Sequence, residues 1–287
     1  MKILITGAYG QLGNELNVLS NQYPEWQFLC TDADTLDITD ENAVELFFQT
    51  HLPGVVINCA AYTAVDKAET DTETAWKINA LAPGILARAA KKTDSKLIHI
   101  STDYVFDGTA CQPLTETVDV NSTGVYGKTK LEGEQNCRSE NPETLIIRTS
   151  WLYSSFGNNF VKTMLRIGKE KVRLNVVFDQ IGTPTFAADL ASAILSIIKK
   201  SEEKPEKFVP GIYHYSNEGV ASWYDFAQAI FEIANINCQI SPVRTVDFPT
   251  PARRPAFSVL DKSKIKNTFG IKIPYWRESL ITCMEKL

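Results

Sequence analysis

The sequence predicts an α/β protein built on a doubly wound parallel sheet, with a smaller second domain toward the C-terminus. In the first half of the 287 residues, short apolar runs alternate with segments of helical spacing. Strands that are buried on both faces and separated by helices belong to parallel sheets with right-handed crossovers. A glycine-rich turn follows the first run directly. The second half loses this alternation and contains a proline- and arginine-rich segment, 249–255, so a different unit is expected there.

The first half supplies five strands and four helices in alternation. The expected strands are Lys2–Thr6, Trp26–Cys30, Gly54–Asn58, Lys96–Ser101 and Thr144–Arg148. The expected helices are Leu12–Leu19, Glu41–Thr50 with Asp40 as its cap, Thr72–Lys92 and Val125–Arg138. The third helix is the longest, and its alanines, isoleucines and leucine recur on one stripe.

The second half returns to the sheet only briefly. Helix Ala187–Lys199 and strand Gly211–Ser216 are assigned to the sheet domain, and the stretch 199–207 is expected to be a solvated loop. The remaining helices are Phe160–Lys169, Ser222–Ala234 and one near the C-terminus. We therefore expect a nucleotide-binding domain of residues 1–149 plus 183–221. The smaller, substrate-binding domain is residues 150–182 plus 222–287.

Composition argues against several classes of partner. The formal net charge is −5 and no long basic run occurs, so neither nucleic acid nor an anionic membrane is an expected partner. No apolar stretch approaches the ~20 residues of a membrane span. The six cysteines form no Cys-x-x-Cys pair and the three histidines are scattered, which predicts reduced thiols, no metal site and a cytoplasmic protein.

The glycine turn after the first strand has the spacing of a Rossmann-type dinucleotide site. Gly7 allows a tight turn, Gly10 lets a pyrophosphate approach the backbone, and Gly13 lets the following helix pack close to the strand. The free N–H groups at the start of that helix favour phosphate. The strand–turn–helix context strengthens a pattern that is weak by itself.

A carboxylate follows the second strand where such sites bind the adenosine ribose. Asp32 can take the ribose hydroxyls and would repel a 2′-phosphate, which favours NADH over NADPH. An ordinary turn aspartate in an acidic loop is the alternative. Asp37 and Ile38 could close over the adenine. Small residues after the third strand, Ala60, Ala61 and Thr63 among them, leave room for the coenzyme.

Tyr126 and Lys130 lie four residues apart on a predicted helix and therefore share one face. A phenol titrates near ~10, and a unit charge about 4 Å away is worth roughly 4 kcal/mol at an effective dielectric of ~20. Lys130 is thus expected to lower the pKa of Tyr126, so that the phenol can protonate a ketone oxygen near pH 7. Two surface residues at helical spacing are the alternative. Among ten tyrosines, only Tyr126 has a lysine four residues on.

Thr102, Tyr126 and Lys130 together resemble the catalytic trio of the extended short-chain dehydrogenase/reductases. Longer strings narrow the resemblance to the dTDP-4-dehydrorhamnose reductase family and span most of the chain. They are NCAAYTAVDKAE (58–69), STDYVFDG (101–108), VYGKTK (125–130), RTSWLY (148–153), GNNFVKTM (157–164), QIGTP (180–184) and ARRP (252–255).

That resemblance implies NAD(P)H-dependent reduction of a dTDP-linked 6-deoxy-4-ketohexose at C4, which gives dTDP-L-rhamnose for polysaccharide synthesis. Tyr126 would donate the proton, Lys130 would lower its pKa and hold the nicotinamide ribose, and Thr102 would steady the phenol. Substrate contacts would come from Thr102, Asp103 and Trp151. The family accepts either coenzyme, so NADH and NADPH both stay open. Positions that match the family's coenzyme contacts are Gly10, Gln11, Leu12, Asp32, Asp37, Ile38, Ala61, Tyr62 and Thr63.

Arg254 is a candidate clamp for the sugar-nucleotide diphosphate, because a guanidinium pairs well with phosphate oxygens. A solvated loop arginine is an equal alternative. Asn158 and Asn159 are expected to shape a loop rather than to bind ligand. Some family members form dimers bridged by magnesium. Glu15 matches one bridging position, but Asp189 stands where a glutamate is expected, so a homodimer stays open and no metal is assigned.

Two other functions compete with the reductase. One is a non-catalytic, NADP-binding regulatory subunit, against which the intact Thr102, Tyr126, Lys130 and Trp151 argue. The other is a sugar-nucleotide epimerase or 4,6-dehydratase. A dehydratase needs a second carboxylate beside Asp103, and the chain has Tyr104 there.

Overall fold

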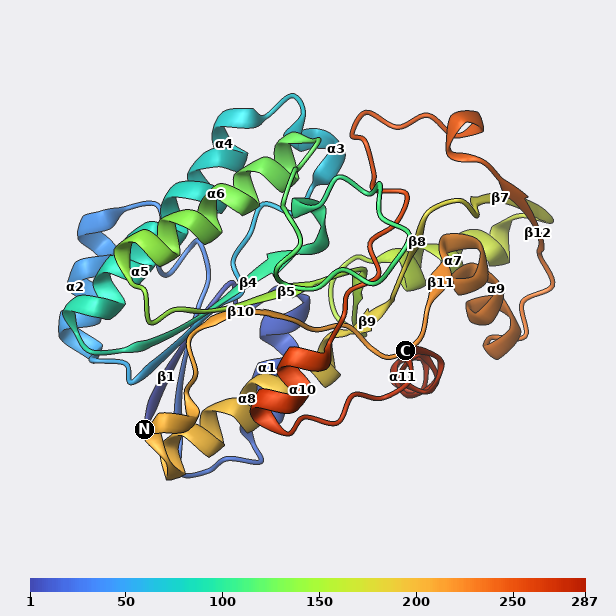
Figure 1. Cartoon of the computed structure of the whole chain (residues 1–287). Helices are drawn as coiled ribbons and strands as arrows, with labels where there is room; N and C mark the ends of the chain where they lie inside the picture. Colours follow the sequence, from blue (N-terminus) through green and yellow to red (C-terminus); the bar gives the residue numbers. More distant parts are fainter.

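Six parallel strands form the central sheet, in the order β10-β5-β4-β3-β1-β2 (Figure 1). This structure is a computed structural model that describes all 287 residues. The strands are β1 (Lys2–Thr6), β2 (Gln27–Thr31), β3 (Val55–Asn58), β4 (Lys96–Thr102), β5 (Leu145–Thr149) and β10 (Gly211–His214). The order reverses between β1 and β3, and ligands of open parallel sheets bind beyond the carboxyl ends of the strands at such a point.

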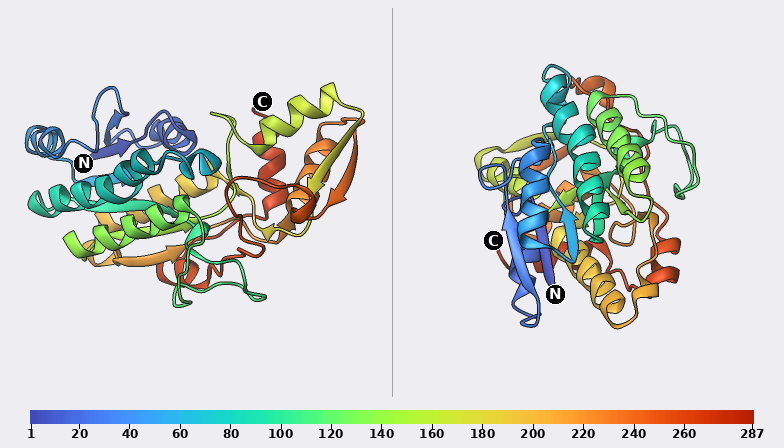
Figure 2. Two further views of the ribbon diagram at one scale, coloured as in Figure 1. Left: turned by 90° about the horizontal axis from the view of Figure 1, so that it is seen from above. Right: turned by 90° about the vertical axis from the view of Figure 1, so that its left-hand side faces the viewer.

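Helices cover both faces of the sheet. On one face lie α1 (Gln11–Ser20), α8 (Ala187–Glu203) and α10 (Ser263–Phe269), packed on strand residues such as Ile5 and Ile57. On the other lie α2 (Glu41–His51), α5 (Ala82–Lys92) and α6 (Val125–Glu140), packed on Leu4 and Val56. Successive residues of a strand thus pack into the cores on opposite faces of the sheet. Figures 1 and 2 show the resulting three layers of helices, sheet and helices.

A second lobe stands beyond the carboxyl ends of the strands and is best seen on the right in the left-hand view of Figure 2. Its helices are α7 (Phe160–Glu170), α9 (Trp223–Ile233) and α11 (Trp276–Met284), and β7 (Arg173–Val177) pairs in parallel with β12 (Gln239–Val243). They share a core of their own that is rich in aromatic rings. Ser222 begins α9 with a capping box, since its hydroxyl accepts from the N–H of Asp225 and the Asp225 carboxylate accepts from the N–H of Ser222.

The remaining elements are short. They are α3 (Val65–Ala68), α4 (Thr72–Trp76), β6 (Leu152–Tyr153), β8 (Ile181–Gly182), β9 (Thr185–Phe186) and β11 (Ala221–Ser222). β6 pairs in parallel with β9, and β8 pairs antiparallel with β11. No helix of the structure combines the length and the apolar character needed to span a bilayer.

The long helix predicted over 72–92 is interrupted. Its middle turn, Lys77–Leu81, is a π-helix between α4 and α5. Pro83 has no N–H to donate to the carbonyl of Asn79, and its ring would clash with that carbonyl in an α-helix. In this wider turn the Asn79 carbonyl lies against Gly133 of α6. A Cβ added to Gly133 would be only 2.1 Å from the Asn79 carbonyl oxygen. The proline therefore explains both the bulge and the need for glycine opposite it.

Two further predictions for the second half need correction. Helix α8 continues to Glu203, so most of the expected loop at 199–207 is helical. Helix α10 packs on the sheet core through Ile265 and Phe269, although the sequence assigned this segment to the second domain. Apolar spacing alone does not reveal which of two cores a short helix joins.

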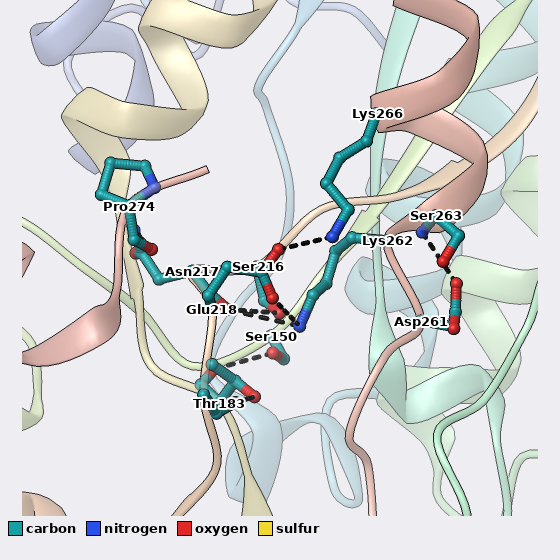
Figure 3. Close-up of polar contacts among 11 residues, drawn as sticks. Ser150, Thr183, Ser216, Asn217, Glu218, Asp261, Lys262, Ser263, Lys266 and Pro274 are labelled. Atoms are coloured by element: carbon teal, nitrogen blue, oxygen red, sulfur yellow. Dashed lines mark hydrogen bonds and ion pairs between the residues drawn. The ribbon is translucent and has the colours of Figure 1, made fainter. Parts of the chain in front are cut away.

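Polar contacts tie together the segments that pass between the sheet and the second lobe (Figure 3). The Ser150 hydroxyl donates to the carbonyl of Thr183 at 2.8 Å, and the Thr183 hydroxyl donates to the carbonyl of Gly219 at 2.8 Å. The buried ammonium of Lys262 lies 3.4 Å from the Asn217 carbonyl and 3.5 Å from the Glu218 carboxylate. These bonds hold the crossover segments together beside the carboxyl ends of the strands.

Candidate active site

A cleft of about 1050 Å³ runs along the carboxyl ends of the strands, between the sheet and the second lobe. Almost every residue that the sequence analysis predicted for the coenzyme or substrate site borders this cleft. These are Gly7, Gly10, Gln11, Leu12, Gly13, Asp32, Asp37, Ile38, Ala60, Ala61, Thr63, Thr102, Asp103, Tyr126, Lys130 and Trp151. Residues from five strand ends thus meet in one place, as the reversal of strand order between β1 and β3 predicts.

The glycines of the turn after β1 serve different purposes. Gly7 has φ +65°, and a Cβ there would lie 2.6 Å from the backbone nitrogen of Ala60, so the loops after β1 and β3 touch at this point. A Cβ on Gly13 would meet the Ala8 Cα at 2.5 Å. At Gly10 the only close atom is the Gly7 carbonyl oxygen at 3.2 Å, and no side chain caps α1. The first N–H groups of α1 are therefore available to a phosphate.

Aspartates border the end of the cleft that lies after β2. The Asp32 carboxylate accepts from the backbone N–H groups of Tyr9 at 3.0 Å and of Ala33 at 2.9 Å. Asp34 and Asp37 also border the cleft, and Lys130 is the only lysine or arginine among its lining residues. This end can accept hydrogen bonds from ribose hydroxyls and offers no cation to a 2′-phosphate.

Tyr126 stands in the first turn of α6, next to the end of β4, and is half-buried. Its ring meets that of Tyr104 edge-on, with centroids 5.3 Å apart. Burial raises the pKa of Tyr126 to about 12. The hydrogen bond with Thr102 lowers this pKa, and the charge of Asp103 raises it further. The phenol is therefore protonated at neutral pH and is available as a donor.

Lys130 lies one turn further along α6 and is buried. Its ammonium donates to the carbonyl of Ile100 at 2.6 Å and lies 3.5 Å from Nε2 of His99. Burial lowers the pKa of Lys130 to about 8, partly opposed by the Glu134 charge. The predicted lowering of the Tyr126 pKa by Lys130 is wrong for this structure, because the burial of the phenol outweighs every other influence and the ammonium is directed to the sheet.

Asp103 begins the short turn after β4 and is 1% exposed. One carboxylate oxygen accepts from the Thr102 hydroxyl at 3.1 Å, and the other has no hydrogen-bond partner. Burial raises the pKa of Asp103 to about 6, although the neighbouring hydroxyls of Ser258 and Thr102 lower it. Thr149, at the end of β5, also borders the cleft with an unpartnered hydroxyl. Both unpartnered oxygens are shielded from solvent, so a polyhydroxylated ligand would pair with them only after a local rearrangement of side chains.

Trp151 follows β5 with φ +48°, a conformation that is uncommon for a bulky residue. Its indole stacks on that of Trp223, and a Cβ added at Gly182 would lie only 2.7 Å from the Trp151 ring. Strained residues held by their surroundings are concentrated at functional sites. The rings give the cleft a fixed aromatic wall.

Two nominated residues lie outside this cleft. The Tyr62 hydroxyl donates to the Asp71 carboxylate at 3.0 Å, so the phenol does not border the cleft. Arg254 pairs with Asp66 at 2.8 Å and lines a separate hollow of about 530 Å³ formed by 107–109, 249–254 and neighbouring residues. The Tyr62 assignment came from a family string in which Ala60, Ala61 and Thr63 border the cleft and Tyr62 does not.

Both carboxylates considered for a metal bridge have partners within the chain. Glu15 is buried and accepts from the Ser154 hydroxyl at 2.6 Å. Asp189 accepts from Asn217 at 2.7 Å and from Ser279 at 2.5 Å.

Asn159 makes one contact more than the sequence analysis predicted, and other cleft residues were not predicted at all. Asn159 caps α7 and donates to the Gln11 side chain at 3.0 Å, so it both shapes its loop, as expected, and joins that loop to the glycine turn. Tyr9, Ser101 and Leu152 border the cleft as well. His99 lies beneath Lys130, and nothing in the spacing of three scattered histidines could have identified it.

The family model described as RmlD substrate binding domain matches residues 1–287. A dTDP-4-dehydrorhamnose reductase from Aggregatibacter actinomycetemcomitans is 43% identical over 286 residues, which cover 97% of each chain. The crystal structure of a dTDP-4-dehydrorhamnose reductase from Clostridium acetobutylicum is 46% identical, with a TM-score of 0.94 and 99% of each chain covered. That from Bacillus anthracis, solved in complex with NADP, is 38% identical, with a TM-score of 0.94 and coverage of 100% of this chain and 99% of the other.

Proposed function

This chain belongs to the RmlD substrate binding domain family, and we propose that it is a dTDP-4-dehydrorhamnose reductase. It reduces the C4 ketone of dTDP-4-dehydro-β-L-rhamnose with NAD(P)H to give dTDP-L-rhamnose, the last step of dTDP-rhamnose synthesis. The observation that carries the proposal is the meeting of a phenol, a lysine and a threonine hydroxyl in the same cleft as the glycine turn.

The glycine turn and the N-terminus of α1 would hold the coenzyme pyrophosphate, and Asp32 would take the adenosine ribose. A bound reduced nicotinamide supplies hydride to the ketone carbon. Tyr126 donates its phenolic proton to the C4 oxygen, because it is protonated at pH 7 and stands at the cleft. Thr102 orients the phenol through the hydrogen bond that they share.

Lys130 is the one cation in the cleft lining and would offset the charge left on Tyr126 once its proton has moved. For this it would exchange the Ile100 carbonyl for the phenolic oxygen or the nicotinamide ribose. Lysine has four rotatable side-chain bonds, which allow such a change without movement of α6.

The sugar would bind among Thr102, Asp103 and Trp151. After a local rearrangement, the unpartnered oxygen of Asp103 would accept from a sugar hydroxyl, and the indole face of Trp151 that is not stacked on Trp223 would pack on the apolar face of the sugar ring. Arg254 would bind the diphosphate only by giving up Asp66, with which it pairs at 2.8 Å. The whole diphosphate carries more negative charge than one carboxylate, which favours the exchange.

We propose that NADH is the better coenzyme, since three aspartates and no lysine or arginine border the adenosine end. The test is an initial-rate comparison of NADH and NADPH with the dTDP-4-keto sugar. A higher kcat/KM with NADH is expected, and replacement of Asp32 by Ser should narrow the difference. Asp119→Ser, at an exposed position outside the cleft lining, is the control.

The same assay separates the reductase from its alternatives. A regulatory subunit would bind coenzyme and consume none. An epimerase or dehydratase would carry tightly bound coenzyme and show no net oxidation of added NADH. Either result with pure, folded protein contradicts the proposal.

A further inference from the structure

Two neighbouring elements bring four polar side chains together under the cleft. His99 and Ser101 are two residues apart on β4 and point to the same side, toward α6. Lys130 and Glu134 are four residues apart on α6 and share the face that meets β4. The result is two buried pairs: Lys130 with His99 at 3.5 Å, and Ser101 donating to Glu134 at 2.5 Å.

The tautomer of His99 follows from its neighbour Asn58. The backbone N–H of Ala60 can only donate, and it donates to Oδ1 of Asn58 at 3.2 Å, as does the Thr6 hydroxyl at 2.8 Å. The amide nitrogen of Asn58 must therefore face Nδ1 of His99, 3.0 Å away. An amide nitrogen donates, so Nδ1 accepts, and the hydrogen of the neutral imidazole is on Nε2. His99 is fully buried, and this burial holds its pKa well below the usual value, which keeps the ring neutral.

The Nε2 hydrogen is directed at the nitrogen of Lys130. An uncharged amine fits both contacts, since one of its hydrogens goes to the Ile100 carbonyl and its lone pair accepts from Nε2. An ammonium has no lone pair, so one of its N–H bonds would face another N–H. We propose that His99 is a positioning residue for Lys130: locked by Asn58, it presents a donor rather than an acceptor to the amine and thereby limits the pH range over which Lys130 stays charged.

The other titratable groups around Lys130 act in the opposite direction. Glu134 and Cys137 from α6 and Cys59 from the end of β3 all favour the charged form. Glu134 is itself engaged by Arg148 and Ser101. Burial opposes Glu134 and leaves the pKa of Lys130 at about 8, close enough to neutral pH for a change of pH to alter its charge. The proposed effect of the His99 donor has the same direction as burial.

The kinetic test rests on the proposed reductase function. The pH dependence of kcat/KM for the coenzyme reports the free enzyme, and we expect an alkaline limb near the pKa of Lys130, about 8. His99→Gln offers a carbonyl oxygen that can accept from the ammonium, which should move this limb up by about one pH unit. His214→Gln is the matched control, because His214 is equally buried in the same sheet, has its Nδ1 on the Leu114 carbonyl and makes no hydrogen bond with Lys130.

An unmoved limb in folded, active His99→Gln would overturn the inference, whereas an inactive wild-type protein would instead contradict the proposed function. A second measurement needs neither activity nor a stable variant. Nitrogen NMR of ¹⁵N-histidine protein, with three ring systems to assign, should show His99 with hydrogen on Nε2 and a bare Nδ1 from pH 6 to 9. A hydrogen on Nδ1 of His99, or a doubly protonated imidazolium ring, would contradict the proposal.

Discussion

The indole of Trp151 lies flat on that of Trp223, with ring centroids 3.7 Å apart and planes 9° from parallel. Trp151 follows the last strand of the sheet before the second lobe, and Trp223 begins α9 of that lobe. The wall of the proposed sugar site is therefore built by both units. Because Trp151 has a positive φ, the stack on Trp223 is one of the contacts that keep it in place.

Replacement of Trp223 by Ala should weaken sugar binding without affecting the coenzyme. A stacked aromatic pair contributes about 0.5–1.5 kcal/mol beyond burial, which corresponds to a rise of roughly 2- to 10-fold in KM for the keto sugar. Initial rates at varied sugar and varied NADH measure the two effects separately. Trp223→Phe keeps a ring under Trp151 and should behave nearly as wild type. Equal losses for sugar and coenzyme would contradict the assignment.

Tyr126→Phe should lower kcat by roughly 10²–10⁴, the usual contribution of a general acid, and leave coenzyme binding intact. The ring and its packing against Tyr104 are preserved, so only the proton donor is lost. Single-turnover rates and a fluorescence titration with NADH provide the measurement. Tyr104→Phe is the control, since Tyr104 is the neighbouring phenol that also borders the cleft. If that variant showed the larger loss, the proton donor would have been misassigned.

Two glycines of the first turn should fail in different ways when changed to Ala. Gly7→Ala places a Cβ 2.6 Å from the Ala60 nitrogen at φ +65°, so it should destabilise the fold by about 1–3 kcal/mol or more. Gly10 has φ −73° and more open space, so Gly10→Ala should fold normally yet lose coenzyme affinity. Thermal unfolding of both variants measures the backbone strain, and NADH titration measures how far the added methyl group blocks the coenzyme. Tight coenzyme binding by Gly10→Ala would place the pyrophosphate elsewhere.

Asp103 should make the protein less stable as pH rises. Its pKa is about 6 in the fold, above the ordinary 3.8, so the folded state binds its proton more tightly than the unfolded state. The resulting stabilisation is present below about pH 4 and is lost as pH rises through 6. Asp103→Asn should therefore be more stable than wild type at pH 7, by up to about 3 kcal/mol, with the advantage vanishing toward pH 4. Urea unfolding at several pH values measures this, and a pH-independent difference would refute it.

Removing one partner of the buried pair of Glu134 and Arg148 should lower the free energy of unfolding strongly, whereas replacing both partners should lower it much less. Their side chains are 2% and 3% exposed, and their closest atoms are 2.7 Å apart. Glu134→Gln leaves the guanidinium uncompensated and should cost about 3–5 kcal/mol, whereas adding Arg148→Met to the same protein should recover much of that loss. Denaturant unfolding provides the free energies. The exposed pair of Glu73 and Lys77 is the control, and Glu73→Gln should leave the free energy of unfolding almost unchanged because solvent screens the pair.

Much of the sheet unit was predictable because its signals are local. Strand Lys2–Thr6 is confirmed residue for residue, and the helix after Asp40 begins where its cap places it, with the carboxylate accepting from Asn42 and Ala43. Apolar runs and caps depend on neighbours in sequence, so they can be read without a partner. The strands of the second lobe, β7 and β12, were not predicted, because each is stabilised by a partner about 65 residues away.

For the site, the sequence by itself determined which chemical groups exist and which of them follow strands of one sheet. A shared edge collects such residues whatever the details of packing, which is why the trio and the glycine turn meet. Only the tertiary structure decided their electrostatics. Burial raises the pKa of Tyr126, and His99, 31 residues before Lys130, faces its amine. Desolvation and long-range hydrogen bonds depend on everything that surrounds a group, and spacing along the chain carries no record of that.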